Sequence, residues 1–187
     1  MVVANMYPMV RVFVAFPLSE EVTDRMVQVQ GVLAGSEAKL SFVKPSAMHL
    51  TLKFIGEIPE GALGRVQEAL REVQYHKFPI SFEGVSCNNP RRPRVIWTVG
   101  SDGGASAELH DLIESALEPL GIEPEGRAFT PHATIARVRH YHPSVMERVM
   151  ELENTSFGEY TVENFFLKKS TLTRQGPIYE DIMEVVL

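Results

Sequence analysis

The 187-residue sequence predicts an α+β fold, in which strands form antiparallel sheets and helices pack outside them. Strand-like and helix-like segments mix along the whole chain, yet several strand pairs follow each other without an intervening helix. Residues 78–85 lead directly to residues 94–99, and the segments after residue 160 behave in the same way. Such neighbours favour antiparallel pairing, whereas a doubly wound parallel sheet needs a helix between successive strands.

In the first half of the chain, residues 10–16 are rich in β-branched and aromatic side chains and predict a strand. Ser19 is then expected to cap a helix. Four apolar residues at helical spacing give this helix a buried stripe: Val22, Met26, Val29 and Leu33. A short strand over residues 40–43, a stronger strand over 48–55 and a helix over 59–74 follow.

The second half of the chain repeats this mixture of elements. Strands are predicted over residues 78–85, 94–99, 132–138, 160–168, 171–173 and 178–186. Helices are predicted over residues 105–120 and 144–152.

Length and composition are those of a folded protein. Hydrophobic residues make up 44% of the chain and charged residues 22%, which is ordinary for a domain with a proper core. The net charge of −6 argues against a protein that coats nucleic acid, so any contact with nucleic acid should be local. The single cysteine, Cys87, excludes an internal disulfide and a zinc site built from cysteines.

The first residues and the lengths of the apolar runs indicate where in the cell the protein is located. The first residues lack the basic and long apolar regions of a secretory signal, and no apolar run reaches the roughly 20 residues that cross a bilayer. We therefore expect a cytoplasmic protein without membrane contact. Residues 1–187 are expected to form a single bilobal domain, with residues 1–8 as a short extension, and a monomer is expected because nothing suggests an obligate partner.

One short pattern occurs twice on predicted strands. His49-Leu50-Thr51-Leu52 and His132-Ala133-Thr134-Ile135 each combine a histidine, an apolar residue, a threonine and an apolar residue, 83 residues apart. Because side chains alternate along a strand, each histidine shares a face with its threonine, and the apolar residues face the helices. Two such strands related by a pseudo-two-fold axis would direct two imidazoles and two hydroxyls at one small volume.

These groups suit phosphoester chemistry without a metal or a cofactor. Histidine can act as base or acid near neutral pH, so two of them can divide these roles. Two threonine hydroxyls can hold the oxygens of a phosphate. A lone histidine on a strand is usually structural, but the repetition favours function. Both motifs also lack nearby Asp or Glu at the spacing of metal ligands, which disfavours a metal-dependent hydrolase.

With these motifs and their flanks, the chain resembles the 2H phosphoesterase superfamily, named for its two H-x-[ST] motifs. Within it, the chain is similar to the RNA 2′,3′-cyclic phosphodiesterases, formerly called 2′-5′ RNA ligases. The resemblance covers nearly the whole chain and rests on six strings: Lys44-Pro45, His49-Leu-Thr-Leu-Lys-Phe-Ile-Gly-Glu57, Arg94-Val-Ile-Trp97, Pro131-His-Ala-Thr-Ile-Ala-Arg137, Ser170-Thr-Leu172 and Gly176-Pro-Ile-Tyr179.

The resemblance implies a bilobal fold in which two antiparallel sheets face a central cleft. It also implies hydrolysis of a terminal 2′,3′-cyclic phosphate, on an RNA 3′ end or a small nucleotide, to a 2′-phosphate. The family positions that carry over are His49 and His132 as catalytic residues, with Thr51, Thr134 and Arg137 binding the substrate. As a hypothesis, His132 is the base and His49 the acid.

Two basic residues near the motifs could lie on either face of their strands. Arg137 lies five residues after His132, so a regular strand would turn it away from the phosphate, toward a surface ion pair, unless the strand ends, twists or bulges near Ala136. Lys53 shares the alternation of His49 and is expected either at the mouth of the cleft or in solvent.

Other interpretations stay open at this level. The cluster Arg91, Arg92 and Arg94 with Trp97 could contact RNA, or could be a solvated loop and a core tryptophan. The remaining histidines are expected to be structural or at the surface: His76, His110, His140 and His142. Besides hydrolysis, ligation as the reverse reaction and a binding module without catalysis remain alternatives.

Overall fold

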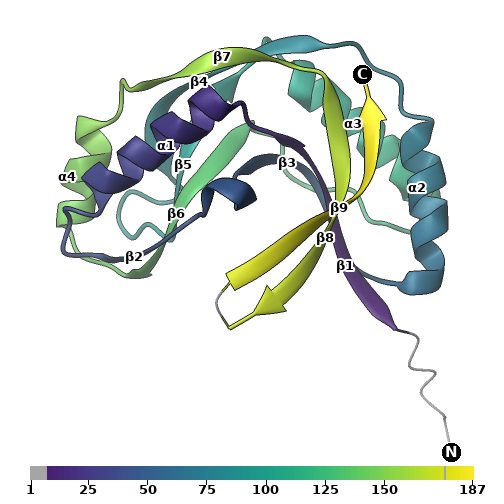
Figure 1. Ribbon diagram of the computed structural model, residues 1–187, viewed down its shortest axis with the longest axis horizontal. Coiled ribbons are helices and arrows are strands. Elements are labelled where there is room, and N and C mark those ends of the chain that lie inside the picture. Colours follow the sequence, from purple (N-terminus) through teal and green to yellow (C-terminus); the bar gives the residue numbers. More distant parts are fainter. Residues whose placement is uncertain (1–7, 175) are drawn as a thin grey trace, which may run out of the picture.

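The computed structural model describes residues 8–174 and 176–187 (Figure 1). The extension expected over residues 1–8 therefore lies, apart from Pro8, outside the described residues. Within the described ranges the strands are β1 (Met9–Pro17), β2 (Lys39–Phe42), β3 (His49–Pro59), β4 (Phe78–Cys87), β5 (Val95–Ser101), β6 (His132–His140), β7 (Ser156–Val162), β8 (Asn164–Thr173) and β9 (Gly176–Val186). The α-helices are α1 (Glu20–Leu33), α2 (Leu63–Arg71), α3 (Ala105–Leu117) and α4 (Ser144–Glu151). Short 3-10 turns are η1 (Pro45–Ala47), η2 (Glu60–Ala62) and η3 (Glu118–Leu120).

The strands form one antiparallel sheet in the order β7-β4-β5-β6-β3-β1-β8-β9, and β2 pairs with β6. The predicted α+β class is thus confirmed. The two expected sheets are two halves of this sheet, and they meet at the centre where β3 pairs with β6 through Leu50 and Ala133. Both residues of this pair are fully buried, so the junction is part of the core.

Helices α1 and α3 are exchanged between the halves. Helix α1 precedes β2 and β3 in the sequence but packs against β6 and β7, whereas α3 precedes β6 but packs against β3. Helix α4 lies beside α1, and α2 beside α3, so that two helix pairs stand at opposite ends of the molecule (Figure 1). In the described ranges, no helix combines the length and apolar character needed to span a membrane.

Helix α1 shows how directly local sequence sets an element. The amide of Val22 donates to the Ser19 Oγ over 3.2 Å, which is the predicted N-cap. All four residues of the predicted apolar stripe are buried in the structure: Val22, Met26, Val29 and Leu33. The prediction of this helix is confirmed from its cap to its last buried residue.

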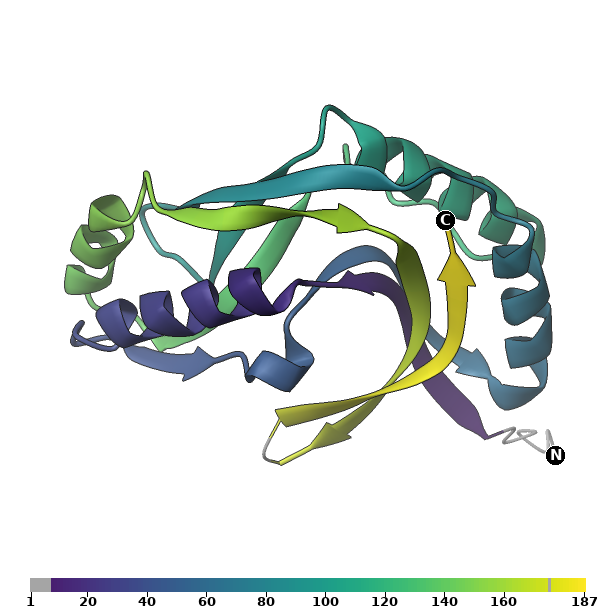
Figure 2. The same cartoon turned by 45° about the horizontal axis from the view of Figure 1, so that its top comes forward.

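The strand predicted over residues 160–168 is instead two strands in different halves. The chain leaves β7, which pairs with β4, and enters β8, which pairs with β1 and β9, at Glu163. The backbone stays extended through the change of partner, so the alternation of side chains does not mark it. Strands β8 and β9 then form the long hairpin that projects from the sheet in Figure 2.

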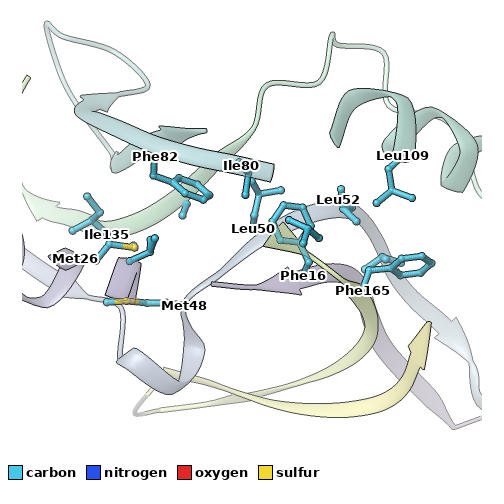
Figure 3. Packing of buried hydrophobic residues seen from close by; sticks show 14 of the residues in the cluster. Phe16, Met26, Met48, Leu50, Leu52, Ile80, Phe82, Leu109, Ile135 and Phe165 are labelled. Atoms are coloured by element: carbon cyan, nitrogen blue, oxygen red, sulfur yellow. The ribbon is translucent and has the colours of Figure 1, made fainter. Parts of the chain in front are cut away.

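One hydrophobic core continues through both halves. Figure 3 shows Leu50 close to Phe16 of β1 and Ile80 of β4, so side chains from both halves meet at the junction. All three side chains are fully buried. The central pair of strands is therefore fixed from behind, and its other face is left for polar side chains.

Candidate active site

The two motifs lie side by side at the centre of the sheet. Leu50 pairs with Ala133 in antiparallel register, so the same register places His49 opposite Thr134 and Thr51 opposite His132. Residues directly opposite each other in such a pair have Cα atoms about 4.5–5.5 Å apart. The four side chains are half-buried and occupy the face turned away from the buried Leu50 and Ala133. The structure thus brings together the four residues of the two predicted motifs.

Both imidazoles are held by the same hydrogen bond. His49 Nδ1 lies 2.9 Å from the carbonyl oxygen of Ala47, and His132 Nδ1 lies 2.8 Å from that of Thr130. A carbonyl oxygen only accepts, so each Nδ1 carries the hydrogen. In the neutral ring, each Nε2 then keeps its lone pair for a substrate.

The ring of His49 packs against two aromatic side chains that the sequence did not single out. Its centroid lies 5.0 Å from that of Phe13 on β1 and 5.2 Å from that of Tyr179 on β9. Phe13 and Tyr179 are also in edge contact with each other at 5.0 Å. The string Gly176-Pro-Ile-Tyr179 was part of the family resemblance, and it was the available signal for Tyr179.

This packing changes the acidity of His49. Burial lowers its pKa to about 4, against the opposing effect of the hydrogen bond to Ala47. Lys168 lowers the pKa further and Asp181 raises it; these two residues form an ion pair with each other on β8 and β9. His49 is consequently a neutral imidazole at pH 7.

His132 has a more open neighbourhood. Its ring centroid lies 4.9 Å from that of Trp97 on β5, a half-buried side chain in register with Thr134. Trp97 therefore borders the site and does not belong to the buried core. Arg91 and Arg92 are exposed in the turn before β5.

Each motif strand bulges directly after its threonine. Thr51 pairs with Ala15 and Lys53 with Val14, which leaves Leu52 as an extra residue in β3. In β6 the extra residue is Ile135, since Thr134 pairs with Trp97 and Ala136 with Ile96. Two consecutive residues are buried at each bulge: Leu52 and Lys53 in β3, and Ile135 and Ala136 in β6. The bulge reverses the alternation of the side chains that follow, up to the next shift in register, which leaves out Ile55 in β3 and Arg139 in β6.

The bulge in β6 returns Arg137 to the face of His132 and Thr134, which is the condition that the sequence set for it. Arg137 is exposed there. Burial raises the pKa of Tyr179, and the positive charges of Arg137 and Arg11 act against this rise. Arg137 thus lies within electrostatic reach of the aromatic group around His49.

The bulge in β3 has the opposite consequence for Lys53, and both expectations for this residue were wrong. Lys53 is 2% exposed, and its Nζ donates to the Glu114 Oε1 over 2.8 Å and to the Glu123 carbonyl over 2.7 Å. Without the bulge it would share the face of His49. His110 is buried beside this ion pair, in the structural role expected for it.

The candidate site lies on the face of the sheet that carries the half-buried side chains of the two motifs. Two hollows of about 330 and 350 Å³ lie elsewhere, and none of the five predicted site residues lines either of them. The first follows α3 and includes His110 and Phe129, and the second includes Pro17 and Tyr160. The geometry of the two motifs, and neither of these hollows, therefore defines the candidate site. In the described part of the chain, no three or more His, Cys, Asp or Glu side chains gather as a metal would require.

Comparison with known proteins decides the family. The model of the LigT like Phosphoesterase family matches residues 16–97 and 101–179. The chain is a LigT-like phosphoesterase. This LigT-like chain is 36% identical to the RNA 2′,3′-cyclic phosphodiesterase of Archaeoglobus fulgidus over 92% of its own length and 97% of the relative. The enzyme of the same name from Methanothermobacter thermautotrophicus is 35% identical over 94% and 97%.

Solved structures agree with this membership. The protein TT0787 of Thermus thermophilus is 28% identical to this LigT-like chain and superimposes with a TM-score of 0.80, covering 95% of this chain and 97% of its own. Escherichia coli LigT in complex with 3′-AMP gives a TM-score of 0.77 at 21% identity over 96% and 98%, and supports the fold. The resemblance to the 2H phosphoesterases is thereby confirmed.

Proposed function

We propose that this chain is an RNA 2′,3′-cyclic phosphodiesterase that opens a terminal 2′,3′-cyclic phosphate to a 2′-phosphate. The observation that carries the proposal is the matched pair of imidazoles. His49 and His132 have the same tautomer and lie on the same face of the sheet, on either side of the Leu50–Ala133 pair. Each has a threonine directly opposite it on the other strand. The names of the curated relatives supply the substrate class.

The reaction needs one base and one acid. A water molecule attacks the phosphorus atom, and its proton passes to the Nε2 of one histidine. The bond from phosphorus to the ribose 3′ oxygen breaks, and the other histidine donates its Nε2 proton to that oxygen. Two histidines on opposite sides of a bound phosphate can perform both transfers.

We assign the base to His49 and the acid to His132, the reverse of the hypothesis from the sequence. A base must be neutral before the reaction, and the lowered pKa of His49, about 4, keeps its Nε2 lone pair free at pH 7. The contact of the His49 ring with Phe13 and Tyr179 excludes water from one side and sustains this state.

The other three residues bind the phosphate in this proposal. Thr51 and Thr134 lie across the strand pair from the two histidines, so their hydroxyls can donate to the two non-bridging oxygens. Arg137 adds a positive charge that favours the phosphate as its charge develops. Trp97, whose ring contacts that of His132 at the border of the site, can stack a base of an RNA 3′ end or of a small cyclic-phosphate nucleotide.

The proposal is tested by incubating the protein in chelator with an oligonucleotide that ends in a 2′,3′-cyclic phosphate. Turnover to a 2′-phosphate is the expected result. Tight binding of this end without turnover would favour a binding module, and activity that returns only with a divalent ion would favour a metallophosphatase. Joining of a cyclic-phosphate fragment to a 5′-hydroxyl fragment, assayed separately, measures the reverse reaction.

The monomeric state and the cytoplasmic location expected from the sequence remain predictions. Sedimentation velocity at micromolar concentration tests the first, since a monomer of 20.9 kDa sediments differently from a dimer. Cell fractionation tests the second.

A further inference from the structure

The two bulges share a feature that the proposed reaction does not use. The carbonyl oxygen of each extra residue accepts a hydrogen bond from a helix behind the sheet. His110 on α3 donates its Nδ1 hydrogen to the Leu52 carbonyl over 2.7 Å. Gln30 on α1 donates from Nε2 to the Ile135 carbonyl over 3.1 Å.

Gln30 also ties the bulge of β6 to a second segment. The same Nε2 donates to the Val43 carbonyl over 2.7 Å, and the Val43 amide donates to the Ile135 carbonyl over 3.0 Å. Both partners of Nε2 are carbonyl oxygens, which only accept, so the amide group of Gln30 has one possible orientation. The NH2 group therefore links the segment after β2 to the bulge.

These contacts follow the exchange of helices between the halves. Helix α1 precedes β3 in the sequence, yet its Gln30 contacts the bulge of β6, and α3 precedes β6, yet its His110 contacts the bulge of β3. Figure 1 shows α1 and α3 on opposite sides of the molecule. Each motif strand is thus fixed from behind by a helix that belongs in sequence to the other motif.

The bulge of β6 positions Arg137. Removal of the extra residue from the pairing would restore simple alternation and turn Arg137 to the face opposite His132. In β3 the same device turns Phe54 toward the site, where it is 60% exposed and its ring centroid lies 6.0 Å from that of Phe13. The two bulges therefore present a cation on one strand and an aromatic ring at the matching position of the other.

We propose that Gln30 is a positioning residue that holds the bulge of β6 and so keeps Arg137 directed at the phosphate. The inference rests on the proposed function for the identity of the phosphate. Gln30 itself lies behind the sheet, on the far side from the candidate site, and acts through the Ile135 carbonyl.

The test uses Gln30→Met, which keeps the length of the side chain and its helix propensity but removes both donors. Gln28→Met is the matched control, because Gln28 is exposed on the same helix one half-turn earlier. Steady-state kinetics on a cyclic-phosphate dinucleotide are measured for both variants, for Arg137→Ala and for the double variant Gln30→Met/Arg137→Ala. Thermal unfolding followed by circular dichroism checks that each variant is folded at the temperature of the assay.

We expect Gln30→Met to lower kcat/KM by at most roughly 10-fold, the loss expected when the contact of Arg137 is removed altogether, and Gln28→Met to leave it unchanged. The double variant should be no slower than Arg137→Ala alone, since Gln30 has nothing left to position. Losses that multiply in the double variant, or a Gln30→Met enzyme as fast as Gln28→Met, would overturn the proposal.

The wild-type rate separates this inference from the proposed function. Absence of wild-type turnover would refute the function. In that case the affinity for inorganic phosphate, measured by titration calorimetry on the same four variants, gives the same comparison. Equal phosphate affinities of Gln30→Met and Gln28→Met would then overturn the positioning role.

Discussion

The β3 and β6 halves of the sheet carry the same motif in different surroundings. In both, the histidine donates Nδ1 to a carbonyl two residues earlier and the threonine precedes a bulge. His49, however, packs between Phe13 and Tyr179, while His132 has Trp97 as its aromatic neighbour. A repeated unit supplies two equivalent groups, and the unequal packing around them gives each one its own acid–base character.

The largest effect on activity is expected from the two histidines. His49→Ala and His132→Ala should each lower kcat by at least ~10²-fold, the low end for the loss of a general acid or base. The exposed His140, at the end of β6, provides a control whose replacement by Ala should change little. Near-normal turnover by either motif variant would show that only one half of the sheet takes part.

The two bulges differ in the side chain that is buried directly after the extra residue, and the free energies of unfolding of variants should show this difference. Lys53 of β3 is buried against Glu114, whereas the matching residue of β6 is Ala136. Lys53→Ala should cost about 3–5 kcal/mol in urea unfolding, because it leaves the Glu114 carboxylate buried without its partner.

The exposed pair of Lys169 and Glu180 on the β8–β9 hairpin is the control. Lys169→Ala should cost less than about 1 kcal/mol, as is usual for surface ion pairs. Equal losses for the two lysine variants would mean that the buried pair has no special part in holding the β3 half.

Arg137 and Phe54 occupy matching positions after the two bulges and should contribute differently. Arg137→Ala should lower kcat/KM by roughly 10-fold, as expected for one charge-assisted contact to phosphate. Phe54→Ala should raise KM and leave kcat unchanged, because an exposed, uncharged ring can contact the substrate but cannot stabilise charge that develops in the reaction. Arg139→Ala is the control for general charge loss on the same strand, and an equal effect there would deny Arg137 a specific contact.

The smallest effect concerns pH and tests which half provides the base. If His49 must be neutral, kcat/KM should not fall between pH 7 and pH 5, because its pKa is lowered to about 4 and protonation begins only near that value. A tenfold fall per pH unit between 6 and 5 would show a base that titrates at the ordinary histidine value. That result would contradict the lowered pKa of His49 and the assignment of the base that rests on it.

Local signals in the sequence were sufficient to predict helix α1 and the two motifs. The cap at Ser19 and the stripe of α1 depend on residues within a few turns of each other, and so does the sharing of a face by His49 and Thr51. Each of these features follows from the periodicity of side chains along one helix or one strand, and the sequence of that segment alone is enough to show it.

The bulges could not be predicted in this way, because a bulge is a relation between two strands. Leu52 is an extra residue only with respect to β1, and Ile135 only with respect to β5. The burial of Lys53 likewise depends on Glu114, 61 residues away. For Arg137 the sequence left three conditions open, an end, a twist or a bulge of the strand near Ala136, and only the pairing with β5 shows that it is a bulge.

The aromatic neighbours of His49 were missed for the same reason. Phe13 and Tyr179 lie at opposite ends of the sequence and meet only because β8 joins β1 to β9 in the sheet. The change of partner strand at Glu163, which makes this meeting possible, leaves no mark in the alternation of side chains.

The central claim is that the two halves form one catalytic unit with a histidine from each. Its most direct test compares single-turnover rates of His49→Ala, His132→Ala and the double variant on a cyclic-phosphate dinucleotide in chelator. Residues that act as a unit are strongly non-additive, so the double variant should be about as slow as either single variant. Losses that multiply in the double variant would contradict the account and would mean that the two histidines act independently.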